Sequence, residues 1–261
     1  MNFANLLFEQ LEPGIHLITI NRPQSLNALD PATVREIDMA LDGIERDEKA
    51  RVLLITGAGS KAFVAGADIV AMRAMTPLEG RDFSAFTQRV FRRLERLRIP
   101  VIALVNGYAL GGGCELAMSC DIVLASETAV FGQPEVNLGV SPGFGGSQRL
   151  PRLVGRALAL ELLLTGRQVK ADEAVTLGLA NHVYPPAELL ERGLEMARQI
   201  AAKGPQAVRF VKELVQRGQD LDLDNACALE SEVFGLLFST EDKAEGMAAF
   251  VERRAAQFKN R

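Results

Sequence analysis

Four short runs of apolar, mostly β-branched residues most constrain the fold, because longer segments of a different periodicity separate them. The runs are residues 15–20, 52–56, 101–105 and 122–125. Two of the intervening segments have helical spacing: residues 31–45, opened by Asp30 as N-cap and Pro31, and residues 80–98, which form one apolar stripe. Alternation of strands and helices predicts an α/β fold.

Beyond about residue 187 the sequence predicts helices only. The helical stretches there are separated by Gly204-Pro205 and by Gly218, and no run resembles a strand. Amphipathic helices need a surface that covers their apolar sides. We therefore expect a mainly helical appendage that packs against a partner surface.

The composition argues against several classes of protein. The 261 residues include 29 Lys and Arg against 33 Asp and Glu, a net charge of −4, so nucleic-acid binding is not expected. No apolar run reaches the roughly 18 to 20 residues of a membrane span, and the N-terminal segment lacks the basic start of a secretory signal. Three cysteines without Cys-x-x-Cys spacing fit a reducing cytoplasm, and two histidines are few for a metal site. The chemistry is then expected to rest on carboxylates and backbone groups.

Two segments resemble catalytic motifs but lack what those motifs need. Residues 53–61 follow a strand as nucleotide-binding loops do, yet they have the spacing of neither glycine-rich phosphate motif. Residues 139–143 match the G-x-S-x-G elbow of serine hydrolases, which needs the N–H after its serine, and Pro142 has none. His182, the candidate base by chain order, is interpreted as a loop residue.

Two turns of small residues could bind an anion. Residues 111–113 are three consecutive glycines between a strand and a helix-like stretch, where unshielded N–H groups at a helix start could hold a developing oxyanion. Residues 65–67 form a second such turn, so that two backbone donors could meet at one oxygen. Close packing of helix on strand would also explain the glycines, and an ordinary helix start would explain the second turn.

Two glutamates are candidates for general acid and base. Glu115 follows the glycines in an apolar first turn, and Glu135 lies beside Pro134 with apolar neighbours. An apolar pocket raises the pKa of a carboxyl group, and a neighbouring carboxylate raises it further, which suits proton transfer near neutral pH. Each residue also has a structural interpretation: Glu115 as a partner of the helix dipole and Glu135 as a solvated loop acid.

Together these motifs resemble the enoyl-CoA hydratases of the crotonase superfamily. The resemblance covers essentially the whole chain. Its segments are RPQSLNALD at 22–30, AGADI at 65–69, NGYALGGGCELAM at 106–118, FGQPE at 131–135, PGFGGSQRL at 142–150 and EGMAAFVERR at 245–254. The pairing of GGGCE with FGQPE is specific for the two-glutamate hydratase branch.

The resemblance implies a role for each matched residue. The N–H groups of Ala67 and Gly112 form an oxyanion hole, Glu115 and Glu135 are the catalytic acids, and Gly143 lines the water site. The resemblance also implies the residues that bind the substrate's CoA moiety and acyl group. They lie in the turn at 22–30 and the segment at 65–69, with Gly112 and Gly143 in addition: Ser25, Leu26, Ala28, Ala65, Ala67, Asp68, Ile69, Gly112 and Gly143.

The reaction implied by the resemblance is the reversible syn addition of water to a trans-2-enoyl-CoA, which gives a 3-hydroxyacyl-CoA in fatty acid β-oxidation. Glu115 is assigned mainly to activating the water and Glu135 mainly to delivering a proton to C2. No metal or other cofactor is implied, since coenzyme A is part of the substrate. The closest alternative is another acyl-CoA enzyme of this fold, such as a Δ3,Δ2-enoyl-CoA isomerase, which two well-placed glutamates disfavour.

The resemblance also implies the architecture. We expect a spiral of ββα units over residues 1–200, which holds the active site, and a helical C-terminal trimerisation region over residues 201–261. A homotrimer, or a homohexamer made of two trimers, is the implied assembly, and the cytoplasm is the expected location. One helix face is basic and is interpreted as solvated or subunit-facing, with contact to CoA phosphates as the alternative; it carries Arg89, Arg92, Arg93, Arg96 and Arg98.

Overall fold

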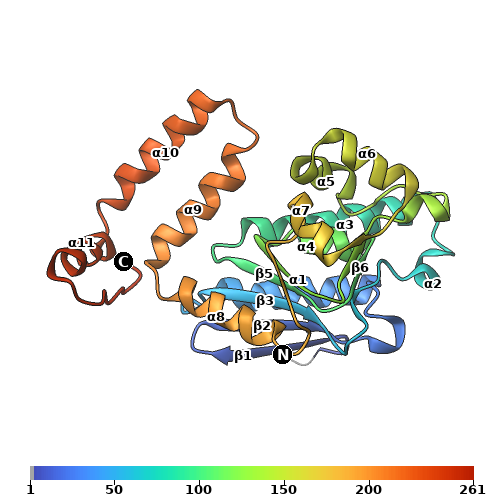
Figure 1. Cartoon of the computed structure of the whole chain (residues 1–261), viewed down its shortest axis with the longest axis horizontal. Coiled ribbons are helices and arrows are strands. Elements are labelled where there is room, and N and C mark those ends of the chain that lie inside the picture. Colours follow the sequence, from blue (N-terminus) through green and yellow to red (C-terminus); the bar gives the residue numbers. More distant parts are fainter. Residues whose placement is uncertain (1–2) are drawn as a thin grey trace.

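The computed structural model describes residues 3–261, and within them the strands form two β-sheets (Figure 1). The larger sheet has six strands in the order β1-β2-β3-β5-β7-β10, and the smaller has four in the order β4-β6-β8-β9. The strands are β1 Leu6–Glu12, β2 Ile15–Ile20, β3 Val52–Gly57, β4 Ala62–Val64, β5 Val101–Val105, β6 Tyr108–Leu110, β7 Ile122–Ser126, β8 Val130–Gly132, β9 Val169–Lys170 and β10 His182–Tyr184.

Successive pairs of strands divide between the two sheets. β3 joins the larger sheet and β4 the smaller, and the pairs β5–β6 and β7–β8 repeat this pattern. The strands that correspond in successive pairs lie parallel. Helices α2 (Ile69–Met72) and α3 (Pro77–Arg96) follow the first pair, α4 (Gly112–Met118) the second, and α5 (Gly146–Val154) and α6 (Arg156–Thr165) the third. The predicted spiral of ββα units is confirmed.

Helices cover both faces of the larger sheet. On one face, α8 (Leu189–Ala201) buries Leu189 and Ala197 against strand residues such as Leu54. On the other face lies the larger core, to which α1 (Pro31–Arg46), α3 and α4 all contribute. The 3-10 helix η1 (Pro23–Ser25) lies between β2 and α1, and α7 (Ala171–Leu177) lies between β9 and β10.

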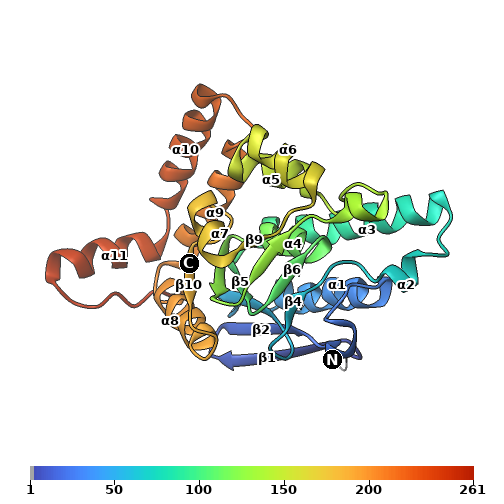
Figure 2. The ribbon, with the colours of Figure 1, turned by 45° about the vertical axis from the view of Figure 1, so that its right-hand side comes forward.

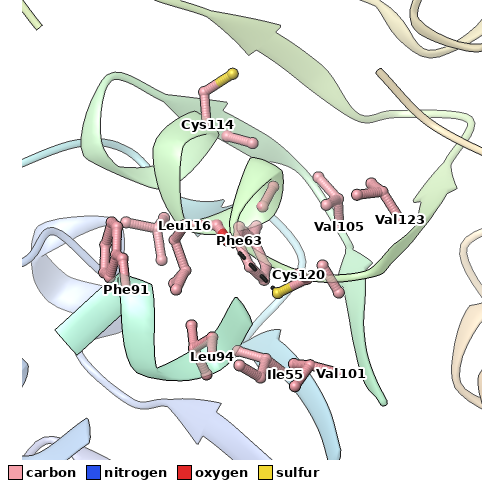
Figure 3. Close-up of a cluster of buried hydrophobic side chains, with 14 of the residues drawn as sticks. Ile55, Phe63, Phe91, Leu94, Val101, Val105, Cys114, Leu116, Cys120 and Val123 are labelled. Carbon is pink, nitrogen blue, oxygen red and sulfur yellow. Dashed lines mark hydrogen bonds between the residues drawn. The ribbon is translucent and has the colours of Figure 1, made fainter. Parts of the chain in front are cut away.

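Helix α4 is embedded in this larger core. Figure 3 shows Leu116 of α4 among Phe63 of β4 and Phe91 and Leu94 of α3. The thiol of Cys120, just after α4, donates a hydrogen bond to the carbonyl of Leu116 over 3.4 Å. A short helix packed on all sides is a rigid support for the residues at its first turn.

Two predicted helices are confirmed, one with a different start. The side chain of Asp30 accepts a hydrogen bond from Thr33 N over 2.7 Å, so Asp30 is the N-cap of α1 as expected. Helix α3 begins at Pro77 instead of residue 80, because Thr76 and Glu79 form a capping box there. The expected apolar stripe of α3 faces the core.

The arginines of the predicted basic face differ in exposure: Arg89, Arg92 and Arg96 are exposed, as the solvated interpretation expects, whereas Arg93 and Arg98 are partly buried. The Arg93 guanidinium forms ion pairs with three acids of α1, Asp38, Asp42 and Glu45, and its side chain is only 22% exposed. The interpretation of Arg93 as solvated or subunit-facing is therefore wrong. His182 was also expected in a loop, but it begins strand β10, which pairs with β7.

Helices alone follow Tyr184 in the chain, as predicted. They are α8, α9 Pro205–Gly218, α10 Leu223–Leu237 and α11 Glu241–Glu252. In both views α10 and α11 lie away from the sheets (Figures 1 and 2). The division of the chain at residue 200 stays a prediction. None of the helices within residues 3–261 has the length and hydropathy of a membrane span.

Candidate active site

The turn that contains Ala67 is held by a short bridge to a neighbouring segment. Leu29 N donates to Gly66 O, and Asp68 N donates to Leu29 O, each over 2.8 Å. These bonds use the residues on either side of Ala67, and Ala67 N itself has no acceptor among residues 3–261. The structure thus fixes the Ala67 amide and leaves its N–H available to another group.

The segment predicted to bind CoA lies on the other side of this bridge. Leu26 O accepts from Ala65 N over 3.0 Å, and the buried Asn27 amide donates to two backbone carbonyls of residues 58–62 over 2.9 and 2.8 Å. These bonds hold the turn although Leu26 and Asn27 have left-handed φ values of 50° and 59°. The structure thus brings the predicted members Ser25, Leu26 and Ala28 beside residues 65–69.

The three glycines at the start of α4 are each explained by the local backbone conformation or by packing. Gly111 has a φ of +48°, and a Cβ on Gly113 would lie 1.9 Å from Val64 O, so α4 approaches β4 as only glycine permits. Gly112 N has no acceptor within the described part of the chain. A Cβ on Gly112 would lie 3.5 Å from Ala67 N, so the two available amides lie close together. Packing therefore explains Gly112 as well as Gly113, since a Cβ on Gly112 would lie 2.9 Å from the Phe144 ring, and the N–H of Gly112 stays available as a donor.

Glu115 is buried one turn into α4, with 1% of its surface exposed. Its Oε1 accepts hydrogen bonds from Phe144 N over 2.8 Å and from Gly146 N over 2.7 Å. Burial raises the pKa of Glu115 to about 7, the Gly146 hydrogen bond opposes this rise, and the nearby carboxylate of Glu135 adds to it. A partner of the helix dipole would need no such burial, so the structure favours a group that exchanges protons near neutral pH.

Glu135 is the first residue of the 3-10 helix η2 (Glu135–Leu138) and is not a solvated loop acid. Its Oε2 is buried and has no hydrogen-bond partner in residues 3–261. A Cβ on Gly111 would lie 2.9 Å from its Oε1 and 3.8 Å from the Cα of Gly66, so this carboxyl group lies beside both glycine turns. Burial raises the pKa of Glu135 as well.

These groups together form one candidate active site. Two neighbouring N–H donors can stabilise negative charge on an oxygen, and two carboxyl groups with raised pKa values can give and accept protons beside it. The sequence-predicted residues Ala67, Gly112, Glu115 and Glu135 are all brought together. The arrangement suits a reaction in which a carbonyl oxygen gains charge while a neighbouring carbon gains or loses a proton.

Of two further predicted residues, Asp68 takes a mainly structural position and Ile69 is exposed. The Asp68 carboxylate caps α2 by accepting from the N–H groups of its first turn, and it pairs with Arg22 over 3.0 Å. Arg22 also pairs with Asp30 over 3.1 Å and donates to the Ala28 carbonyl, so it ties the two segments together. Ile69 is 48% exposed at the start of α2, where its side chain is open to a ligand.

The loop of residues 143–146 contains functional groups that the sequence interpretation missed. Gly143, predicted to line a water site, uses its carbonyl to accept from Gln88 over 2.8 Å, whereas Phe144 and Gly146 supply the two N–H groups that hold Glu115. The buried Gln133 was also missed; its Oε1 has no hydrogen-bond partner within residues 3–261. The glycines on either side of Phe144 in PGFGG were the available signal, because such a loop can turn its amides inward.

The chain is similar to known proteins in both sequence and fold. The family model described as enoyl-CoA hydratase/isomerase matches residues 10–261. The chain belongs to this family. The structure of this chain superimposes on the crystal structure of an enoyl-CoA hydratase from Bacillus anthracis with a TM-score of 0.96. The two sequences are 38% identical, and the match covers 99% of this chain and 100% of that one. The crotonase-type fold expected from the sequence is confirmed.

Two curated members of the enoyl-CoA hydratase/isomerase family are similar over their full length. The short-chain-enoyl-CoA hydratase of Clostridium acetobutylicum is 51% identical over 262 residues, which cover 100% of both chains. The crotonyl-CoA hydratase of Syntrophomonas wolfei is 48% identical over 258 residues, which cover 99% of both chains.

Proposed function

We propose that this protein is an enoyl-CoA hydratase that adds water reversibly to a trans-2-enoyl-CoA and forms a 3-hydroxyacyl-CoA. The observation that carries the proposal is the pair of available N–H groups, on Ala67 and Gly112, beside two buried carboxyl groups of raised pKa. The relatives named short-chain-enoyl-CoA hydratase and crotonyl-CoA hydratase support hydration and short acyl chains. A place in fatty acid β-oxidation is part of the proposal.

The oxyanion hole polarises the substrate. With the thioester oxygen between Ala67 N and Gly112 N, electron density is drawn from the conjugated double bond, and the enolate-like charge that develops during water addition is stabilised. One such donor contributes about 2.7 to 4 kcal/mol to transition-state stabilisation. The N-terminal end of α4 adds a favourable dipole at the same oxygen.

The two glutamates bind the water and transfer the protons. Both hydrogen bonds to Glu115 fall on Oε1, which leaves Oε2 to hold the water and take its proton as it attacks C3. Glu135, whose Oε2 has no partner within residues 3–261, holds the same water and delivers a proton to C2. Because the two carboxyl groups interact, the apparent pKa values of a titration belong to the pair and not to either residue alone. Each glutamate therefore has a main role and shares part of the other's.

The proposed binding residues follow from the same placement. Backbone groups of Ser25, Leu26, Ala28 and residues 65–69 bind the CoA part of the substrate, and Gly143 lines the entry to the water site. Hydration is redox-neutral, and the backbone donors supply the polarisation. The proposed mechanism therefore involves no metal or redox cofactor, and coenzyme A enters as part of the substrate.

A homotrimer, or a homohexamer of two trimers, is the proposed assembly. It is supported by large apolar side chains exposed on the C-terminal helices, among them Phe234, Phe250 and Val251 at 63%, 85% and 79%. Sedimentation equilibrium would measure the mass of the assembly; a monomer at micromolar concentration would contradict this part.

A cytoplasmic location is also proposed, since Cys114, Cys120 and Cys227 are free thiols, the form that a reducing compartment maintains.

The decisive experiment follows the loss of enoyl-thioester absorbance when purified protein is mixed with crotonyl-CoA. Hydration by the wild-type protein, reduced at least about 100-fold in Glu135→Gln, is the expected result. A longer trans-2-enoyl-CoA sets the chain-length range. No absorbance loss with either substrate, together with conversion of a 3-enoyl-CoA, would replace the proposal with isomerisation.

A further inference from the structure

We infer that Arg149 is a positioning residue for Glu115: it holds the loop whose amides bind the Glu115 carboxylate, and the buried Glu95 in turn holds Arg149. The inference rests on the proposed hydratase function for its kinetic test. It also predicts a property of Glu115 that can be measured without substrate.

Phe144 connects the two side chains through its backbone. Its N–H donates to Glu115 Oε1 over 2.8 Å, and its carbonyl accepts from Arg149 Nη1 over 2.8 Å. The peptide planes on both sides of Phe144 are therefore restrained by charged groups at opposite ends. If the Phe144 carbonyl rotates, the neighbouring amides that hold Glu115 lose their alignment.

Arg149 is itself held in one orientation. Its Nε donates to Glu95 Oε1 over 2.5 Å, and the second oxygen of Glu95 accepts from Arg92 over 2.6 Å. The Glu95 side chain is 8% exposed and that of Arg149 is 15% exposed. Breaking one partner of such an enclosed pair leaves the other charge uncompensated, so the guanidinium does not leave Glu95 readily.

Gly145 lets the guanidinium lie against the loop. Its φ is +108°, and a Cβ there would lie 2.1 Å from Arg149 Nη1. The Phe144 ring packs edge-on against Phe83 and Phe91, with ring centroids 5.2 and 6.0 Å away. Ring packing fixes where Phe144 is, whereas the Arg149 hydrogen bond fixes how its peptide is turned.

Charged groups surround both Glu115 and Glu95, the two carboxyl groups that this connection joins. Burial raises the pKa of Glu115, the carboxylate of Glu135 in η2 adds to this rise, and the positive charge of Arg149 in α5 opposes it. The Cys114 thiol, its neighbour on α4, is neutral because burial raises its pKa as well. Behind Glu95 lie Arg92 and, from α9, Lys212, which pairs with Asp121 over 2.7 Å. Removing Arg149 therefore takes away a charge that favours the Glu115 carboxylate as well as a hydrogen bond to the loop.

The test compares Arg149→Met with Arg149→Lys, Glu95→Gln and the control Arg152→Met. Arg152 lies on the same helix with a 55% exposed side chain and pairs only loosely, at 3.5 Å, with Asp220. In Arg149→Met we expect kcat on crotonyl-CoA to fall about 10-fold to 100-fold with little change in KM, because Glu115 is displaced from the attacking geometry. The acid limb of its kcat–pH profile should move to higher pH, since a carboxylate-stabilising charge is gone.

The other variants separate position from charge. Arg149→Lys keeps the charge, so its acid limb should stay near the wild-type pH while kcat recovers only in part. Glu95→Gln keeps the Arg149 charge but loosens it, so kcat should fall without a movement of the limb to higher pH. Arg152→Met should match the wild type in both respects.

An infrared titration of the protonated-carboxyl band of Glu115, assigned by its loss in Glu115→Gln, measures the same effect without turnover. Wild-type kcat and an unmoved Glu115 titration in Arg149→Met would overturn the inference while leaving the hydratase proposal intact. No hydration by the wild-type protein would instead remove the proposed function, and the infrared titration would still decide the inference. If Arg149→Met does not fold, wild-type kcat in both Glu95→Gln and Arg149→Lys would overturn it.

Discussion

Replacing Glu115 with Gln should stabilise the fold at high pH while abolishing hydration. Burial raises the pKa of Glu115 from 4.5 to about 7 in the folded protein. Between these two pH values the unfolded chain releases a proton that the folded protein keeps, so the free energy of unfolding of the wild-type protein falls as the pH rises. At about 1.4 kcal/mol per pH unit, the cost of the buried carboxylate approaches about 3 kcal/mol above pH 7.

A glutamine at this position carries no charge at any of these pH values. Its amide oxygen can still accept the hydrogen bonds from Phe144 N and Gly146 N that Glu115 Oε1 now accepts. Relative to the wild type, Glu115→Gln should therefore gain about 3 kcal/mol of unfolding free energy between pH 4.5 and pH 8. Its kcat on crotonyl-CoA should fall at least about 100-fold, because the group that activates water is lost.

Urea denaturation followed by far-ultraviolet circular dichroism, at pH 4.5 and pH 8 and one protein concentration, measures this difference. Glu48→Gln, at an exposed position, is the matched control and should follow the wild type at both pH values. The reasoning is refuted if the stability difference between Glu115→Gln and the wild type is the same at both pH values.

Three further predictions concern the frame of the site and its pH dependence. Gly113→Ala should lower the unfolding free energy by about 3 kcal/mol, because its Cβ would lie 1.9 Å from Val64 O; an unchanged thermal midpoint would contradict the close approach of α4 and β4. Asn27→Ala should cost about 2 to 4 kcal/mol, since two backbone carbonyls lose the amide that now binds them, and urea denaturation checks this. The wild-type kcat on crotonyl-CoA should fall as the pH drops below about 7, where Glu115 becomes protonated, and a kcat that stays constant from pH 8 to pH 5.5 would exclude Glu115 as the base.

The strands of the larger sheet could be predicted where they are buried along their whole length. β2 and β5 have the predicted bounds and β3 extends one residue beyond its apolar run, because all three are buried along nearly their whole length. The three-residue strands β4, β6 and β8 were not predicted, since a run of three residues has no measurable periodicity and becomes a strand only through its partner.

The candidate site divides in the same way between local and distant signals. The two amide turns and the first-turn glutamate could be proposed because a few adjacent residues determine them. The groups that hold Glu115 could not, because Phe144 and Gly146 lie 29 and 31 residues further along the chain and reach it only through the fold. Nothing near Glu95 in the sequence indicates that its carboxylate orders the same loop.

The features that make the site reactive each oppose stability. Ala67 N and Gly112 N have no acceptor within residues 3–261, and Glu115 is buried with a carboxyl that must ionise near pH 7. Such groups persist only where the surroundings leave them no alternative. Helix α4 meets this requirement because Gly113 brings it against β4 and its other faces lie in the core. The rigidity of α4 is therefore part of the chemistry: a looser helix would let the two amides find backbone acceptors and let Glu115 reach water, and both changes would stabilise the resting protein at the expense of the transition state.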